Sequence, residues 1–374
     1  MKYYIIAGER SGDLHGGALI HYILERDPEA NIRGWGGDDM RSAGMDLQKH
    51  YRETAFMGFL EVVKNLKRIR RFLRECKEDI SGFAPDAIIL IDYPGFNLRI
   101  AAYAKSLNIP VHYYISPKVW AWNRKRAHKI RKLVDHLYVI FPFEVSFFKE
   151  YNVEAIYVGN PLVQEVDGYL ASHGETMPQV REHPIIAVLP GSRHQEVKSM
   201  LQIMLQVADV MPSCRFVVAA VSNLPAELYS SAVNHSSVEV LTDKAYQILG
   251  QADAAIVTSG TATLETALFE VPQVVGYKTS KLTYFLAKKL IKIRFISLVN
   301  IVADRKVVTE LIQDDLTAQN IQKELSALTG NTPERQEMIA GYKEIKRLLG
   351  KKNAPLEAAE HIVNSLKRNG SGSL

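Results

Sequence analysis

The sequence predicts an α/β protein of two doubly wound domains, each built on a parallel sheet with helices on both faces. Three observations predict this fold class. Continuous apolar runs, which are typical of strands buried on both faces, alternate with helical patterns. The alternation stops near the middle of the chain and then restarts. The length of 374 residues suits two domains better than one core.

The first half carries six apolar runs that predict strands, at 2–7, 32–35, 87–91, 111–115, 137–140 and 155–158. Helical patterns at 16–25 and 99–106 lie between them. These elements predict a first domain over 1–167, and we expect a helix at 355–368 to complete it.

Residues 168–184 are rich in Gly, Ser, Pro, His and charges without an apolar period, which predicts a linker. The strand pattern then restarts at 185–189, 215–220, 238–241 and 254–257, with helices at 201–210 and from 263. The sequence therefore predicts a second domain over 184–340. Ligands of such sheets bind outside the carboxyl ends of the strands, so the loops after strands are the candidate sites, and we expect them to face one cleft.

Composition and cysteine usage narrow the class of protein. Hydrophobic residues make up 47% and charged residues 23%, which is typical of a globular protein with ample core. The two cysteines, Cys76 and Cys214, show no metal-binding or redox spacing, which suits a reducing compartment. The sequence shows no signal peptide and no apolar run of about 18 residues, so we expect a cytoplasmic protein.

The net charge of +5 is clustered in two stretches, 59–74 and 281–295, where apolar residues at helical spacing alternate with Lys and Arg. Basic amphipathic helices can rest on an anionic membrane surface, and we expect such a partner here. The alternative is that the apolar stripes pack on the protein's own sheets. No nucleic-acid partner is expected, because the sequence shows no RNP-like or helix-turn-helix motif.

The loop after the first strand contains Glu9, Ser11, Gly12, Asp13 and His15. Small residues let the backbone turn tightly, and a helix start favours an anion. The loop matches neither a Walker A nor a G-x-G-x-x-G pattern. An ordinary strand-to-helix turn is the alternative interpretation.

Asp92 follows the most β-branched strand and stands beside Pro94-Gly95. A carboxylate at this strand end could accept a proton from an attacking hydroxyl, or it could merely cap the next helix. The next loop, 116–126, places Ser116, Trp120 and Trp122 beside a cluster of cations. It could hold a sugar, an acyl chain or a phosphate, or form a packed domain interface.

Two loops of the second half repeat one design. Gly191, Ser192 and Arg193 follow a strand directly and precede Glu196, which places a bidentate donor beside free backbone N–H groups and suits a diphosphate. Small hydroxyl residues also open the helix at 259–261. The members of this second loop are Ser259, Gly260, Thr261 and, one turn later, Glu265, which could accept from a ribose diol. A capping box explains part of the pattern.

Together these motifs resemble the lipid-A-disaccharide synthase family. The family's Glu-x-Ser-Gly-Asp, Ser-Pro-x-Val-Trp-Ala-Trp, Leu-Pro-Gly-Ser-Arg-x-x-Glu and Ser-Gly-Thr-x-x-Leu-Glu motifs match 9–13, 116–122, 189–196 and 259–265. The stretch from Ser297 to Asn300 is similar to the family's Ser-Leu-Pro-Asn, with Val299 in place of Pro. The resemblance runs from about residue 3 to 350, and the Trp-containing motif is its specific part.

The resemblance implies a GT-B fold, in which the first Rossmann-like domain faces the membrane and binds the acceptor and the second binds UDP-sugar. It implies an inverting hexosyltransferase that moves 2,3-diacylglucosamine from UDP-2,3-diacylglucosamine to the 6-hydroxyl of 2,3-diacylglucosamine 1-phosphate (lipid X). The products would be a β-1,6 disaccharide 1-phosphate and UDP. Lipid A synthesis implies peripheral association with the inner membrane, and a homodimer stays open.

Inversion requires one displacement with a general base, for which we expect Asp92, with His15 as the second candidate. Some family members carry another Asp where this chain has Gly95, which favours Asp92 here. Arg193 and the helix start at 259–261 should neutralise the leaving diphosphate, so neither a metal nor a cofactor is expected.

The remaining roles follow the same resemblance. We expect Glu265 to hold the ribose and Asn300 to contact the donor, while Glu9 and Ser11 shape the acceptor pocket near the two tryptophans. A UDP-sugar 2-epimerase and a non-catalytic lipid- or nucleotide-binding protein are the alternative functions.

Overall fold

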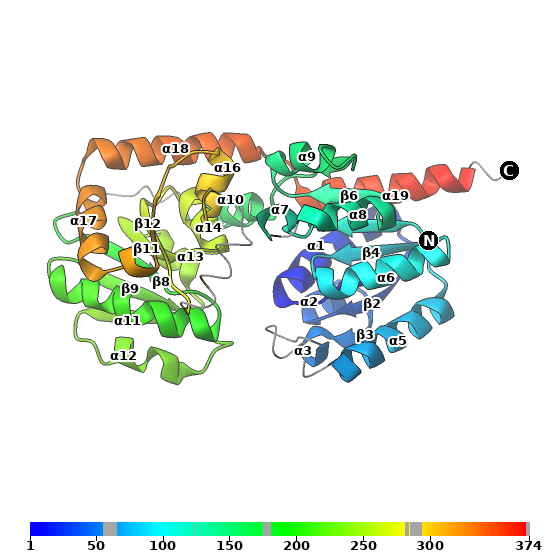
Figure 1. The fold of residues 1–374 in the computed structure, drawn as a ribbon, viewed down its shortest axis with the longest axis horizontal. Coiled ribbons are helices and arrows are strands. Elements are labelled where there is room, and N and C mark those ends of the chain that lie inside the picture. Colours follow the sequence, from blue (N-terminus) through cyan, green and yellow to red (C-terminus); the bar gives the residue numbers. More distant parts are fainter. Residues whose placement is uncertain (55–65, 123, 175–180, 281–283, 285–293, 372–374) are drawn as a thin grey trace. The chain divides into compact units, whose positions relative to one another are not determined.

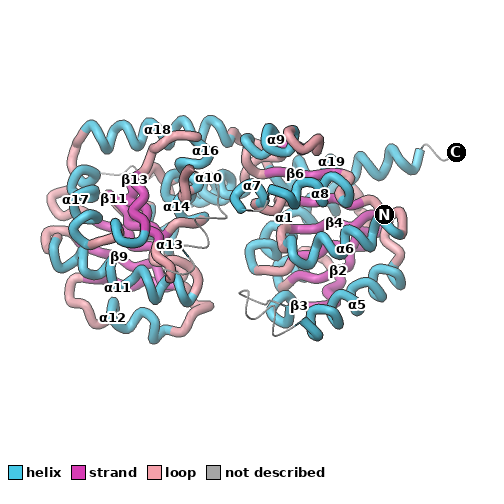
Figure 2. Tube along the Cα trace, in the orientation of Figure 1, coloured by secondary structure: helices cyan, strands magenta, loops and turns pink. Residues whose placement is uncertain are grey.

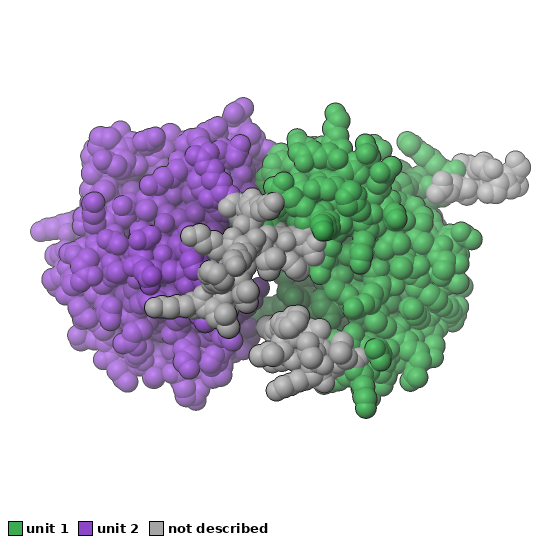
Figure 3. Space-filling model, viewed as in Figure 1, with its two compact units in different colours: residues 1–161, 351–374 green, residues 162–350 purple. Residues whose placement is uncertain are grey.

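The computed structural model describes residues 1–54, 66–122, 124–174, 181–280, 284 and 294–371. The chain forms two compact units (Figure 3). Unit 1 comprises Met1–Pro161 and Lys351–Leu374, and unit 2 comprises Leu162–Gly350. The sequence put the end of the first domain at 167 and of the second at 340.

Unit 1 is built on a seven-stranded sheet whose strands are all parallel, in the order β3-β2-β1-β4-β5-β6-β7 (Figure 1). Its strands are β1 (Lys2–Ala7), β2 (Asn31–Gly36), β3 (Asp46–His50), β4 (Ala87–Ile91), β5 (Val111–Tyr114), β6 (His136–Val139) and β7 (Ala155–Tyr157). Every residue of β4 is buried, as expected for a central parallel strand. The strand β3 was not predicted, because its sequence is largely polar and it lies at the sheet edge.

Helices flank the strands of each sheet (Figure 2). Those of unit 1 are α1 (Arg10–Arg26), α2 (Asp38–Ser42), α3 (Tyr51–Thr54), α5 (Leu66–Phe83), α6 (Pro94–Ser106), α7 (Val119–Trp122), α8 (Ala127–Leu133), α9 (Pro142–Lys149) and α19 (Ala354–Ser371). Two start earlier than predicted, since helices were expected from 16 and 99. The turns before them contain only two residues, so most of the loop residues singled out in the sequence are helical.

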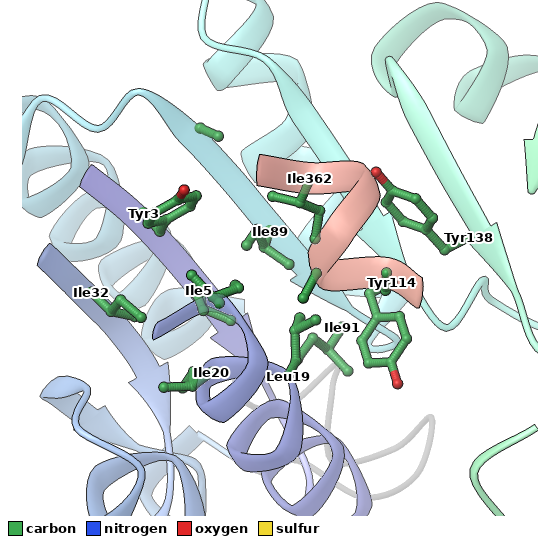
Figure 4. Close-up of a cluster of buried hydrophobic side chains, with 14 of the residues drawn as sticks. Tyr3, Ile5, Leu19, Ile20, Ile32, Ile89, Ile91, Tyr114, Tyr138 and Ile362 are labelled. Atoms are coloured by element: carbon green, nitrogen blue, oxygen red, sulfur yellow. The ribbon is translucent and has the colours of Figure 1, made fainter. Parts of the chain in front are cut away.

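The core of unit 1 joins the two ends of the chain (Figure 4). Alternate residues of β1 point to opposite faces of the sheet. Ile5 packs with Ile89 and with Ile362 of α19 on one face. On the other face, the hydroxyl of Tyr4 donates to Asp79 of α5 at 2.6 Å. The C-terminal helix, expected at 355–368, therefore packs on the first sheet and belongs to unit 1.

Unit 2 is built on a six-stranded parallel sheet in the order β10-β9-β8-β11-β12-β13. Its strands are β8 (Ile185–Leu189), β9 (Arg215–Ala220), β10 (Val238–Thr242), β11 (Ala254–Thr258), β12 (Gln273–Tyr277) and β13 (Thr309–Ile312). The last two were not predicted. In β12, Gly276 interrupts a short apolar run because a side chain there would lie 2.7 Å from Met200.

The helices of unit 2 are α10 (Pro161–His173), α11 (His194–Val210), α12 (Ser230–Val233), α13 (Ala245–Leu249), α14 (Thr261–Leu268), α16 (Leu298–Ala303), α17 (Ala318–Thr329) and α18 (Pro333–Leu349). Pro161 is the only residue of α10 in unit 1. The predicted linker is wrong over 168–173, which are helical, and 175–180 lie outside the described residues. Helix α11 begins at His194 and not at 201.

Both sheets reverse their direction of winding at the first strand. In unit 1, β1 has β2 on one side and β4 on the other; in unit 2, β8 lies between β9 and β11. At such a switch point the connecting helices leave toward opposite faces and open a crevice outside the carboxyl ends of the two strands. The topology thus singles out the turns after β1 and β4, and those after β8 and β11.

None of the helices in the described part of the chain combines the length and the hydrophobicity that a membrane span requires. Only 66–74 of the predicted basic stretch 59–74 is described in backbone, and in the stretch 281–295 only residues 284, 294 and 295 are described.

Candidate active site

The pairing of β1 with β4 brings the first crevice together. Ala7 lies opposite Ile91, so the next residues, Gly8 and Asp92, are neighbours. The ring of Tyr93 lies over Gly8, where an added Cβ would come within 2.4 Å of the ring. Glycine at position 8 is therefore required for this close approach.

The turn that carries Asp92 is strained. Asp92 and Tyr93 have φ values of +41° and +49°, in the left-handed region. The amide of Asn97 donates to the carbonyls of Ile91 at 3.1 Å and Asp92 at 2.8 Å, and the hydroxyl of Tyr113 donates to the same Asp92 carbonyl at 2.5 Å. Strain of this kind persists only where neighbours fix the backbone, and it occurs preferentially at functional sites.

Asp92 is not the N-cap residue of the helix that follows, because that position is taken by Tyr93, whose backbone hydrogen-bonds the Asp92 carboxylate. Burial raises the pKa of Asp92 to about 6; the Lys118 ammonium lowers it and Glu9 raises it further. A carboxylate near pKa 6 is mostly ionised at neutral pH and is more basic than an ordinary Asp, which suits a general base.

His15 lies in the second turn of α1, and Glu9 and Ser11 are exposed at the helix start. Burial lowers the pKa of His15 to about 4, so its imidazole is neutral at pH 7 and a weaker base than Asp92. The roles of His15, Glu9 and Ser11 stay predictions. Gly12 is buried, with Ala7 3.2 Å from where a Cβ would lie, so it lets α1 pack against β1.

Asp13 is 2% exposed and holds the start of α2. Its carboxylate accepts from the backbone N–H groups of Gly37 at 2.7 Å, Asp39 at 3.2 Å and Met40 at 3.1 Å. These bonds give Asp13 a structural role, and its contact with a substrate stays a prediction.

The Trp-containing motif is anchored by a residue that the sequence did not single out. Glu144 of α9 is 1% exposed, and its Oε1 accepts from Trp120 Nε1 at 3.0 Å and Ser116 Oγ at 3.3 Å. Trp120 is 6% exposed and packs edge-on against Phe143, with ring centroids 5.0 Å apart. Both motif residues are therefore buried within unit 1, while the side chain of Trp122 lies outside the described residues.

In unit 2, the turn after β8 has formed around an internal anion. Gly191 has a φ of +112°, and the Glu196 carboxylate accepts from the N–H groups of Ser192 and Arg193, both at 3.2 Å. Arg193 Nη1 also donates to Glu196 at 2.7 Å. The N–H groups and guanidinium that the sequence assigned to a diphosphate thus converge on one carboxylate, which shows that the turn accepts negative charge.

The second switch-point turn opens α14. Ser259 Oγ donates to the Ile296 carbonyl at 2.8 Å, and Gly260 and Thr261 are exposed at the helix start. Thr258 is 5% exposed, and its hydroxyl has no hydrogen-bond partner among the described residues. An unpartnered buried hydroxyl at this strand end suits a polar ligand.

Glu265 lies one turn into α14 and accepts from the Tyr246 hydroxyl at 3.1 Å. Burial raises its pKa. Burial, followed by the charge of Glu265, raises the pKa of Glu165 in α10 to about 7. The residue expected to hold a ribose therefore belongs to a cluster with Glu165 and Tyr246, which the sequence did not reveal.

Asn300 is 1% exposed, and its side chain is fully used within unit 2. Its Nδ2 donates to the Val308 carbonyl at 3.0 Å and to Glu310 at 2.9 Å, and its Oδ1 accepts from Val307 and Val308 N–H groups. An amide has two donors and two acceptor positions, and all four are taken. Direct contact of this amide with the donor substrate would break some of these hydrogen bonds. The structure therefore favours a role in which Asn300 positions the backbone around it.

In the described part of the chain, no group of three or more His, Cys, Asp and Glu residues could hold a metal ion.

The family of this chain is shown by its sequence along nearly its whole length. Residues 3–363 match the family described as lipid-A-disaccharide synthetase. The chain belongs to this family. The lipid-A-disaccharide synthase of Myxococcus xanthus is 36% identical over 373 residues, 98% of this chain and 97% of that protein. That of Coxiella burnetii is 36% identical over 367 residues, 96% of this chain and 97% of that protein. The predicted family, and with it a glycosyltransferase of lipid A biosynthesis, is confirmed.

Solved structures confirm the predicted GT-B fold of this lipid-A-disaccharide synthase family member. The glycotransferase of kitacinnamycin has a TM-score of 0.65 at 14% identity, over 98% of this chain and 99% of that one. The UDP-GlcNAc 2-epimerase of Neisseria meningitidis bound to UDP-GlcNAc has a TM-score of 0.63 at 15% identity, over 98% and 100%. At these identities the likeness concerns the fold alone.

Besides Glu165 and Tyr246, the sequence did not single out two carboxylates that accept from backbone N–H groups, Glu144 and Glu310. Glu144 follows Phe141-Pro142-Phe143 at a strand end, and a Pro at the first helical position with Glu at the third is a readable helix-start pattern. Glu310 carried no such signal, since its partners at 296, 297 and 300 lie outside its own strand.

Proposed function

We propose that this chain transfers 2,3-diacylglucosamine from UDP-2,3-diacylglucosamine to the 6-hydroxyl of lipid X. The products would be the β-1,6-linked disaccharide 1-phosphate and UDP. Family membership supports the substrates. The structural observation that carries the mechanism is a partly buried carboxylate, Asp92, at the switch point of the first sheet, with its pKa raised to about 6.

Asp92 would act as the general base. The acceptor's 6-hydroxyl oxygen forms a bond to the donor's anomeric carbon while Asp92 takes its proton. The bond from that carbon to the diphosphate oxygen breaks in the same step, and UDP leaves with the electron pair. One displacement inverts the anomeric centre, which accounts for a β product from an α-linked donor.

Unit 2 would hold the leaving nucleotide. Arg193 and the N–H groups at the start of α11 already converge on the carboxylate of Glu196, and α14 opens with Gly260 and Thr261. Preorganised donors of this kind stabilise charge that develops on a leaving group. Because Arg193 supplies the positive charge, we expect turnover to persist in EDTA, measured as UDP release.

The first test is an assay with UDP-2,3-diacylglucosamine and lipid X in detergent micelles that follows disaccharide and UDP together. Equimolar appearance of both supports the proposal. UDP release without disaccharide would instead indicate a hydrolase or an epimerase-like activity. Absence of turnover, with binding retained, would indicate a binding protein.

We also propose a peripheral association with the inner membrane, supported by the exposed face of α5. Arg70 and Arg74 are exposed there. They line a groove of about 650 Å³ in which three cations outnumber one carboxylate; its other members are Leu73, Lys77, Glu78, Ser81 and Tyr103. The opposite face of α5 buries Phe72, Cys76 and Ile80. The described part of this stretch therefore packs an apolar stripe on its own unit and presents cations outward, which suits anionic headgroups.

A further inference from the structure

We propose that Glu144 is a positioning residue that holds the 116–120 segment, and with it the Lys118 ammonium, beside Asp92. This inference rests on the proposed role of Asp92 as the base. It assigns a function to a buried carboxylate that touches no reacting atom.

The two oxygens of the Glu144 carboxylate bond different segments. Its Oε2 accepts from the N–H groups of Ile140 at 3.2 Å and Phe141 at 3.0 Å, as in an ordinary helix start. Its Oε1 is not needed for that purpose. It accepts instead from Ser116 and Trp120, which follow a different strand, β5. The carboxylate therefore joins the loop after β5 to the loop after β6.

Burying the Glu144 carboxylate has a free-energy cost. Burial raises the pKa of Glu144 to about 7 in spite of its four hydrogen bonds. An apolar side chain would fill a buried position at less free-energy cost, and one acceptor would suffice to cap α9. A buried carboxylate is stable only while its hydrogen bonds are formed, so Glu144 holds its four donors in one geometry.

The segment after β5 has a backbone conformation that other groups must hold in place. Ile115 has a φ of +60°, which is rare for a β-branched residue. Ser116 follows at 3% exposure. A backbone in this conformation relaxes unless its neighbours hold it, and Glu144 bonds both ends of the following turn, at Ser116 and at Trp120.

The 116–120 segment lies beside Asp92. Ile91 pairs with Tyr114, so Asp92 and Ile115 are neighbours at the carboxyl ends of β4 and β5. Lys118 lies three residues further on. Its side chain is exposed while Pro117 and Val119 are buried, so the backbone fixes where the ammonium begins. The Lys118 ammonium lowers the pKa of Asp92, which agrees with this placement.

The experiment measures kcat/KM against pH for the full chain and for Glu144→Gln, Lys118→Met and the double variant. Gln keeps the volume but presents an amide NH2 where one carboxylate oxygen stood. It can therefore accept from the donors of one oxygen only, either Ser116 and Trp120 or the N–H groups of Ile140 and Phe141. Without the nearby cation, Asp92 holds its proton more tightly. We expect the acid limb of Lys118→Met to move to higher pH by about half a unit or more. Glu144→Gln should move it in the same direction, and the double variant no further than Lys118→Met alone.

Two further variants keep the test decisive. Trp120→Phe removes the indole donor to Glu144 but keeps a ring against Phe143, so it should shift the limb even if Glu144→Gln fails to fold. Asp135→Asn is the matched control. Asp135 accepts from the Val111 N–H at 2.9 Å and from Lys105 at 2.7 Å, at the amino ends of β5 and β6. It should lower the melting temperature and leave the limb in place.

An acid limb that stays in place in both Glu144→Gln and Trp120→Phe, with activity lowered equally at every pH, would overturn the inference. So would additive shifts in the double variant. Failure of the proposed function is a different result, namely no disaccharide from the unaltered chain.

Discussion

The proton affinity of Asp92 links activity to stability. Its pKa in the folded state, about 6, lies above the value of 3.8 for an unburied group. The folded state therefore binds this proton more tightly than the unfolded state, and stability falls as pH rises from about 4 to about 6. Asp92→Asn removes the buried charge and suits the left-handed backbone. We expect it to abolish turnover and to raise the free energy of unfolding at pH 7 by up to about 3 kcal/mol, measured by denaturant titration. A less stable variant, or one that keeps wild-type turnover, would contradict this prediction.

The acid limb of kcat/KM decides between the two candidate bases. If Asp92 is the base, the rate falls as pH drops through about 6, because its carboxylate gains a proton. If His15 were the base, its pKa of about 4 would place the limb two units lower. We expect a limb near 6 that stays there in His15→Gln. A limb near 4 in the unaltered chain would favour His15.

At the scale of the element, α16 and β13 are joined through one amide. Asn300→Ala removes four hydrogen bonds, one of them a donor to Glu310, and leaves the Val307 and Val308 N–H groups and the Val308 carbonyl without the partner that the amide supplies. We expect this change to lower the free energy of unfolding by about 2–4 kcal/mol, measured by denaturant titration. Asn320→Ala, which removes one exposed hydrogen bond, to the Asp315 carbonyl near the start of α17, is the control and should cost less than about 1 kcal/mol. An Asn300→Ala variant of unchanged stability that no longer binds UDP would instead show direct contact with the nucleotide.

The elements also show which parts of the fold and of the candidate site could be predicted from the sequence. Apolar runs such as 87–91 and 254–257 predict their strands because both faces are buried. The turns with Asp92 and Arg193 could be read as candidate sites for the same reason, since each follows a buried run, and their contact with a ligand stays a prediction. What could not be predicted is which partners lie across the fold. The bonds from Trp120 to Glu144 and from Asn300 to Glu310 join separate elements, so the sequence did not reveal that these two side chains, which it assigned to ligands, are also bonded within the protein.

At the scale of the molecule, association with a membrane should depend on where the cations lie as well as on the net charge of +5. Each Lys or Arg near an anionic bilayer contributes about 1 kcal/mol. Reversing Arg70, Arg74 and Lys77 together should therefore weaken binding to vesicles containing phosphatidylglycerol by about 100-fold or more, measured by co-sedimentation at low salt. The control reverses Lys306, Lys323 and Lys343, which are exposed in unit 2 and change the net charge equally. It should bind vesicles more tightly than the α5 variant, and both should retain turnover in micelles. Equal losses would mean that only net charge matters, and unchanged binding of the α5 variant would move the contact away from this helix.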